Sequence, residues 1–302
     1  MRHQLLPRLI TALVLFVSLS FALAPIQTSG ILLHYSDFGS KYVDARNVDV
    51  WVPSDYTADK KYAVLYMHDG QMLFDSTATW NHQEWQVDET MTRLMGENKI
   101  RDCIVVGIWN NGKKRRGEYM PQKPFNTLKQ DLQDSLLAKD YAGAVLSDNY
   151  LKFIVEELKP FIDSSFSTFT DRQNTFIAGS SMGALISLYA VCEYPEVFGG
   201  AACLSTHWPG NLTNLHTEIP QAINTYLQNN LPDPANHKLY FDYGTVTLDS
   251  LYAPSQAIVD ITVKQKGFTE QNWITKEFPG ESHSEQAWSK RLAIPMEFLL
   301  KP

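Results

Sequence analysis

The stretch that decides the fold reads TFIAGSSMGA and covers residues 175–184. An apolar run of strand length ends there, and an apolar segment with helical spacing begins a few residues later. Gly179 and Gly183 lie two positions either side of Ser181, where a turn this tight has no room for larger side chains. The pattern predicts a strained strand-to-helix turn that exposes Ser181 as a nucleophile, and the alternative is a glycine-rich structural turn. Ser180, its neighbour, lacks the two flanking glycines.

Strand and helix patterns alternate on both sides of this turn. Short apolar runs predict strands at residues 31–35, 47–52, 62–67, 102–108, 174–178, 200–204, 238–243 and 272–278. Helical spacing of apolar residues is found at 84–95, 150–158, 184–192, 256–266 and 285–300. Continuous apolar strands that alternate with helices predict the α/β class, a mostly parallel sheet with helices on both faces. Residues 110–144 are the least regular stretch and predict a loop that covers the substrate.

Length and charge limit the classes of partner. A chain of 302 residues with 44% hydrophobic and 20% charged residues predicts a folded protein with one catalytic domain, at 25–302. The net charge of −7 argues against nucleic acid or an anionic membrane as the main partner. The basic cluster at 113–116 lies beside glycines and is interpreted as a solvated loop.

The N-terminus has the features of an export signal. Arg2 and Arg8 precede an apolar run, and the sequence Ala22-Leu23-Ala24 is typical of a cleavage site. We therefore expect residues 1–24 to be a signal peptide, and the mature protein to be secreted or periplasmic. An uncleaved N-terminal anchor is the alternative, and no other stretch is long and apolar enough to span a membrane.

The cysteines and histidines show no pattern of a metal site. Cys103, Cys192 and Cys203 are predicted to be buried thiols, with a Cys192–Cys203 disulfide as the alternative. None of them lies near a histidine at metal-ligand spacing, and no glycine-rich nucleotide loop is present. We expect neither a metal nor a cofactor.

A base and an acid are expected after the serine. In proteins whose nucleophilic serine lies on such a strand-to-helix turn, the order along the chain is Ser, then Asp or Glu, then His. His283 follows the strand at 272–278 and precedes the last helix, which is the position required of the base. His237 is expected to be exposed, and His216 is interpreted as a surface residue. His207, after the strand at 200–204, is better placed to line a pocket.

The acid is expected in the loop after the strand at 238–243. Asp249 lies in that loop and is the preferred candidate, while Asp242 lies inside the strand and is the alternative. Two backbone N–H groups are expected to bind the oxyanion, those of Met182 after the nucleophile and Gln71 after an earlier strand. Asp69, close by, is interpreted as structural.

The combined segments resemble the putative esterase family of α/β-hydrolases. The matching motifs are Asp69-Gly70-Gln71, Val105 to Ile108 followed by Asn110, Arg115 to Pro121, the Ser181 turn, Gly244-Thr245, and His283 followed by Trp288. The family includes enterochelin-esterase-like proteins, S-formylglutathione hydrolase, and feruloyl and acetyl-xylan esterases. It also includes the antigen 85 acyltransferases, whose reaction is the alternative here to ester hydrolysis.

The resemblance also implies residue roles. Arg115, Glu118 and Tyr119 would lie near the mouth of the active site. One departure concerns the acid, which many members place two residues after Gly-Thr, where this sequence has Thr247. The aromatic residues expected near strand ends, where a pocket would form, are Trp80, Trp85, Trp109, His207 and Trp208. Trp109, His207 and Trp208 are the substrate-binding candidates for a small-molecule or carbohydrate-linked ester, and the alternative is that several of these aromatics belong to the core.

Overall fold

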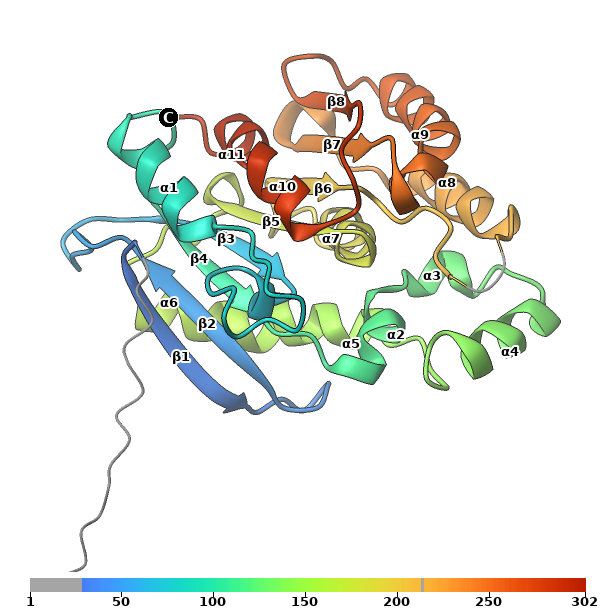
Figure 1. Cartoon of the computed structure of the whole chain (residues 1–302), viewed down its shortest axis with the longest axis horizontal. Helices are drawn as coiled ribbons and strands as arrows, with labels where there is room; N and C mark the ends of the chain where they lie inside the picture. The colour runs from blue at the N-terminus through green and yellow to red at the C-terminus, as the bar shows by residue number, and fades with distance from the viewer. Residues whose placement is uncertain (1–28, 213–214) are drawn as a thin grey trace, which may run out of the picture.

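One eight-stranded sheet passes through the part of the chain that the computed structural model describes, residues 29–212 and 215–302 (Figure 1). Its strand order is β1-β2-β4-β3-β5-β6-β7-β8. The strands are β1 (Ile31–Phe38), β2 (Arg46–Val52), β3 (Ala63–His68), β4 (Cys103–Ile108), β5 (Thr175–Ser180), β6 (Gly200–Leu204), β7 (Lys238–Gly244) and β8 (Trp273–Phe278). The expected signal peptide lies outside the described residues.

The sheet is mostly parallel, as its sequence predicts. β1 pairs with β2 and β2 with β4 in antiparallel fashion, and the pairings from β4 through β8 are parallel. Every residue of β3, β4, β5 and β6 is buried, because helices cover both faces of these strands. Their sequences are accordingly continuous apolar runs. β1 and β8 lie at the two edges and contain exposed residues.

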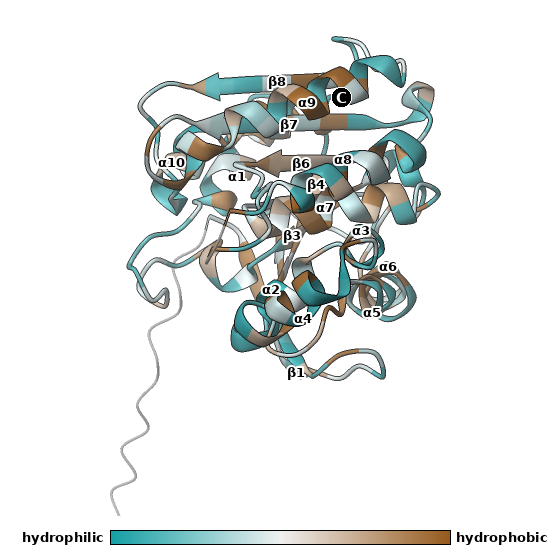
Figure 2. Ribbon diagram, turned by 90° about the vertical axis from the view of Figure 1, so that its right-hand side faces the viewer, coloured by the Kyte–Doolittle hydropathy of each residue, from teal (hydrophilic) through white to brown (hydrophobic). Residues whose placement is uncertain are grey.

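Helices form a layer on each side of the sheet (Figures 1 and 2). One hydrophobic core joins the sheet to the first and last helices of the chain, and the other joins it to the central helices. The helices are α1 (Val87–Gly96), α2 (Arg115–Tyr119), α3 (Gln122–Phe125), α4 (Gln130–Lys139), α5 (Ser147–Lys152), α6 (Lys159–Ser165), α7 (Met182–Glu193), α8 (Glu218–Asn230), α9 (Ala253–Gln265), α10 (Glu285–Arg291) and α11 (Ala293–Leu299).

The structure differs from the expected elements along residues 110–144, 218–230 and 285–300. Residues 110–144 hold α2, α3 and α4, so the expectation of an irregular loop is wrong. Residues 218–230 form α8, a helix that was not expected, although its buried positions are three and four residues apart. The expected final helix is two helices. Pro295 in α11 explains the break, because a proline ring clashes with the carbonyl four residues earlier, here Arg291 at the end of α10.

The helix expected at 150–158 extends beyond these residues at both ends. α5 continues through a π-helical segment, η3 (Phe153–Leu158), into α6. Cys103, Cys192 and Cys203 are buried and free, which confirms the prediction of buried thiols over a Cys192–Cys203 disulfide. No helix between residues 29 and 302, leaving out 213–214, is long and apolar enough to cross a membrane.

Candidate active site

Three polar residues lie where parallel strands end. Ser181 directly follows β5, Asp249 lies in the turn η6 (Thr247–Leu251) after β7, and His283 lies between β8 and α10. The carboxyl ends of parallel strands share one edge of a sheet, which is where open α/β proteins bind ligands. Residues far apart in the sequence are therefore brought to one site.

Ser181 occupies a strained turn. Its φ of 57° and ψ of −122° are unusual for a residue with a side chain, and α7 begins at the next residue. Its N–H donates to Leu204 O at 3.0 Å, and its carbonyl accepts from the His207 N–H at 3.2 Å. A Cβ on Gly179 would lie 2.8 Å from the Gly183 carbonyl, so the demand for a small residue at 179 comes from direct backbone contact. The strand-turn-helix geometry predicted around Ser181 is present.

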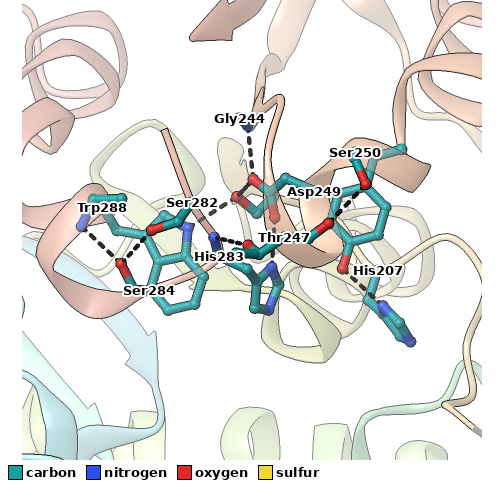
Figure 3. Close-up of polar contacts among 12 residues, drawn as sticks. His207, Gly244, Thr247, Asp249, Ser250, Ser282, His283, Ser284 and Trp288 are labelled. Carbon is teal, nitrogen blue, oxygen red and sulfur yellow. Dashed lines mark hydrogen bonds and ion pairs between the residues drawn. The ribbon is translucent and has the colours of Figure 1, made fainter. Parts of the chain in front are cut away.

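His283 is paired with Asp249 (Figure 3). The His283 Nδ1–H donates to Asp249 Oδ1 at 2.6 Å, and the other carboxylate oxygen accepts from Gly244 N at 2.7 Å and Ser205 Oγ at 2.5 Å. The Asp249 side chain is fully buried. Burial alone raises its pKa, but the hydrogen bonds from His283, Ser205 and Gly244 outweigh burial, and its pKa is lowered overall. Asp249 is therefore held as a carboxylate.

Thr247 occupies the position at which many members of the resembled family carry the acid. Its φ is 55°, and its hydroxyl accepts a hydrogen bond from the His283 backbone N–H at 2.9 Å. Asp249, two residues further on, reaches the ring of the same histidine. The turn η6 thus fixes both the main chain and the side chain of His283.

Asp242, the alternative acid, has different partners. It lies fully buried in β7 and binds Arg291, with 2.9 Å between Oδ1 and Nη2. The Tyr240 hydroxyl donates to its other oxygen at 3.0 Å. Burial raises the pKa of Asp242, although Arg291 opposes this effect. Asp242 therefore forms an ion pair with Arg291 of α10, while Asp249 contacts His283.

A pocket of about 670 Å³ opens beside Ser181 and His283. Its aromatic part consists of Trp80, Trp85 and Trp288, and the Trp80 side chain is largely exposed. Trp288 also meets the His283 ring edge-on, with 4.9 Å between ring centroids. The pocket therefore combines an apolar wall with the histidine.

Amide and charged side chains complete the pocket. The amides come from Gln71, Asn81, Gln83 and Asn110. Arg115 borders it too, and its Nε and Nη2 groups donate to the two oxygens of Asp69 at 2.6 and 2.7 Å. Burial alone raises the pKa of Asp69, but Arg115 and Asn110 outweigh this and lower it. The Asp69–Arg115 pair thus fixes an anion and a cation in the wall, consistent with the structural interpretation of Asp69.

Of the three residues expected near the mouth, only Arg115 borders the pocket. Glu118 is buried and binds Arg46, with 2.8 Å between Oε1 and Nη2. Tyr119 is buried under the Arg115 guanidinium, 5.1 Å from its ring centroid, and its hydroxyl accepts from Asp69 N at 3.4 Å. Glu118 and Tyr119 therefore support the pocket wall from behind.

The three other substrate-binding candidates, Trp109, His207 and Trp208, do not line this pocket. His207 is buried; its Nε2–H donates to Asn211 O at 3.0 Å and its Nδ1 accepts from the Tyr252 hydroxyl at 2.8 Å. Burial lowers the pKa of His207 to about 4, so the ring is neutral. Trp208 is buried and donates to Gln256, and Trp109 borders a neighbouring pocket of about 560 Å³.

His237 and His216 were expected on the surface. His237 is buried, and its two ring nitrogens contact the carbonyls of Asp233 and Pro195, so the expectation of exposure is wrong for it. His216 is half-buried. Among the described residues, no group of three or more His, Cys, Asp or Glu side chains is arranged to hold a metal ion.

The expected oxyanion donors lie at two helix starts. Met182 is the first residue of α7, and Gln71 belongs to the short turn η1 (Gly70–Met72) after β3. N–H groups in a first turn have no carbonyl partner within the helix, which leaves them free for an anion. Ser205 and Arg291, which no sequence motif pointed to, also belong to the hydrogen-bond network behind Asp249.

The fold and this site define an esterase of the α/β-hydrolase class. The chain belongs to the family described as putative esterase, whose model matches residues 40–294. The uncharacterised protein YjcH of Bacillus subtilis is 26% identical over 50% of this chain and 51% of its own length. The uncharacterised protein YbbA of the same organism is 22% identical over 84% of this chain and 92% of its own length. The chain thus spans about half the length of the first of these relatives.

Solved structures share the fold. A ferulic acid esterase of Anaeromyces mucronatus, in complex with ferulic acid, has a TM-score of 0.60 and 20% identity over 90% of each chain. The enterobactin esterase of Shigella flexneri, in the presence of enterobactin, has a TM-score of 0.68 and 16% identity. That match covers 91% of this chain and 60% of the enterobactin esterase. Identities this low concern the fold alone.

Proposed function

We propose that the chain is a serine carboxylic-ester hydrolase that works through an acyl-enzyme on Ser181. The observation that carries the proposal is the shared pocket: strained Ser181 borders it together with His283, whose Nδ1 lies 2.6 Å from buried Asp249. A histidine held in one tautomer by a carboxylate, in the same pocket as a serine, supports activation of the serine hydroxyl.

In the proposed reaction the Ser181 oxygen attacks the acyl carbon while its proton passes to His283 Nε2. Asp249 orients the ring and stabilises the imidazolium that forms. The negative oxygen of the tetrahedral intermediate is bound by the Met182 and Gln71 N–H groups. The alcohol then leaves with the proton from His283, and water, activated by the same histidine, releases the acid from Ser181.

The pocket supports a substrate with both aromatic and polar parts. Trp80, Trp85 and Trp288 offer ring faces and edges, and the amides of Gln71 and Asn110 offer donors and acceptors. We propose a small-molecule or carbohydrate-linked ester, and a panel of feruloyl, acetyl-sugar and simple acyl esters would identify the acyl group. Export of the mature enzyme is proposed from residues 1–24 alone.

The first prediction tests the nucleophile. Ser181→Ala removes the attacking oxygen, so kcat for a p-nitrophenyl ester should fall by about 10⁴-fold or more. Ser187→Ala is the matched control, because it removes a buried serine hydroxyl from α7 that donates only to Gly183 O. A fluorophosphonate should label wild-type protein at Ser181, located by mass spectrometry of the peptide. Retained turnover in Ser181→Ala would overturn the proposal.

The same assay separates hydrolysis from transfer. With a sugar acceptor present, hydrolysis predicts free acid as the product. Accumulation of an acylated sugar would assign the chain to the acyltransferase alternative, with the same serine.

A further inference from the structure

A buried serine stands directly behind the proposed catalytic acid. Ser205 is the first residue after β6, is completely buried and has a φ of 45°. Its backbone N–H donates to Asp242 O at 2.8 Å, which fixes the residue to the end of β7. Its hydroxyl contacts Asp249 Oδ2 at 2.5 Å, Trp288 Nε1 at 2.9 Å and Arg291 Nη2 at 2.9 Å. An unfavourable backbone angle is thus maintained at a position with three polar contacts.

The direction of each hydrogen bond follows from the partners. An ionised carboxylate only accepts, while an indole N–H and a guanidinium only donate. The one proton of Ser205 must therefore go to Asp249, and its two lone pairs accept from Trp288 and Arg291. A hydroxyl that accepts two donors, one of them cationic, is polarised toward its own acceptor and has no other orientation open to it.

The two donors come from one face of α10. Trp288 and Arg291 are three residues apart, so their side chains project from the same side of the helix. Arg291 is itself held by both oxygens of Asp242, at 3.1 Å from Nε and 2.9 Å from Nη2. Trp288 in turn contacts the His283 ring. The helix that follows His283 thus also aligns the hydroxyl behind Asp249.

We propose that Ser205 is a positioning residue for Asp249: its hydroxyl, aligned by Trp288 and Arg291, holds Oδ2 so that Oδ1 faces His283. The inference rests on the proposed function of Asp249. Without the Ser205 oxygen, Trp288 Nε1 loses its acceptor, Arg291 keeps Asp242 as its partner, and Asp249 Oδ2 keeps only the Gly244 N–H. The carboxylate is then held less firmly toward His283, and the imidazolium loses stabilisation.

The second prediction follows for Ser205→Ala and Ser205→Gly. Both should lower kcat by roughly 10- to 100-fold with KM unchanged, because the loss concerns the transition state. The acid limb of the pH profile of kcat/KM should move to lower pH, since an imidazolium that is less stabilised gives up its proton more readily. Glycine suits a φ of 45°, so Ser205→Gly keeps the test open if Ser205→Ala folds poorly.

Ser147→Ala is the matched control. Ser147 is fully buried at the start of α5, and its hydroxyl accepts from Gln122 N. Asp249 lies in a different part of the fold, in the turn η6 after β7. Loss of the Ser147 hydroxyl should leave the pH profile of kcat/KM unchanged. A kcat and pH profile at wild-type values in both Ser205 variants, with only a lower free energy of unfolding, would overturn the inference. Ser181→Ala measured alongside distinguishes the two proposals, because retained activity there defeats the proposed function itself.

Discussion

Two aspartates seven residues apart show how environment divides roles between identical side chains. Asp242 points into the buried network of Arg291 and Tyr240, and Asp249 reaches His283. Asp242 lies inside β7 and Asp249 lies in the turn after it, and both carry the same carboxylate, so residue type does not separate them. The hydrogen-bond partners of the two aspartates separate their roles.

The third prediction compares Asp249→Asn with Asp242→Asn. Asp249→Asn should lower kcat by about 10⁴-fold with the fold intact, because an amide no longer stabilises the imidazolium or fixes its tautomer. Asp242→Asn leaves Arg291 with a weaker partner, so we expect it to lower the free energy of unfolding by about 3 kcal/mol. Steady-state kinetics and urea unfolding on both variants measure the two effects. The reverse pattern, a larger kcat loss in Asp242→Asn, would assign the acid to Asp242.

At the level of the secondary-structure elements, the β5–α7 turn depends on close contact between backbone atoms. The two glycines that flank Ser181 face each other across the turn, and their tolerances differ. A Cβ at Gly179 would lie 2.8 Å from Gly183 backbone atoms, whereas a Cβ at Gly183 would lie 3.3 Å from the His68 Cβ. Backbone contact cannot relax without opening the turn.

The fourth prediction is that Gly179→Ala is the more damaging change. It should lower the free energy of unfolding by about 1–3 kcal/mol and displace the Ser181 side chain, so that kcat falls as well. Gly183→Ala should cost less, since small shifts relieve its contacts. Thermal unfolding and ester turnover for each variant provide the test, and equal losses in the two would contradict the contact distances.

For the whole molecule, two buried histidines couple stability to pH. Burial lowers the pKa of His68 to about 3 and that of His207 to about 4. In the unfolded chain both return to about 6.5. As pH falls below about 6.5 the unfolded state therefore binds more protons than the folded state, and the free energy of unfolding decreases. This loss continues until the folded-state pKa of each ring is reached.

The fifth prediction is an acid-sensitive fold. Between about pH 6.5 and 4, each histidine should reduce the free energy of unfolding by about 1.4 kcal/mol per pH unit. Urea unfolding at several pH values measures the slope. His68→Gln should remove one histidine's contribution, so the slope should change by about 1.4 kcal/mol per pH unit, whereas His82→Gln, on the surface, should not change it. A slope in His68→Gln equal to that of the unmodified protein would contradict the prediction.

The eight strands, the mostly parallel sheet and the turn at Ser181 could be predicted from the sequence. These follow from local causes: apolar runs mark buried strands, and two glycines mark a turn that excludes side chains. The sequence also placed His283 after the last strand. Local patterns were weaker for α2, α3 and α4, because each of these helices is short or buries few apolar residues.

Which carboxylate contacts His283 depends on the tertiary structure. Asp249 lies 34 residues before His283 in the chain, and the turn η6 places the two side chains in contact. The tertiary structure also placed His207 and Trp208 in the core, paired Arg115 with Asp69, and joined Ser205 to α10. Such contacts depend on the packing of distant elements and on the direction of each side chain. No spacing along the sequence encodes them, because the hydrogen-bond partners come from different strands and helices.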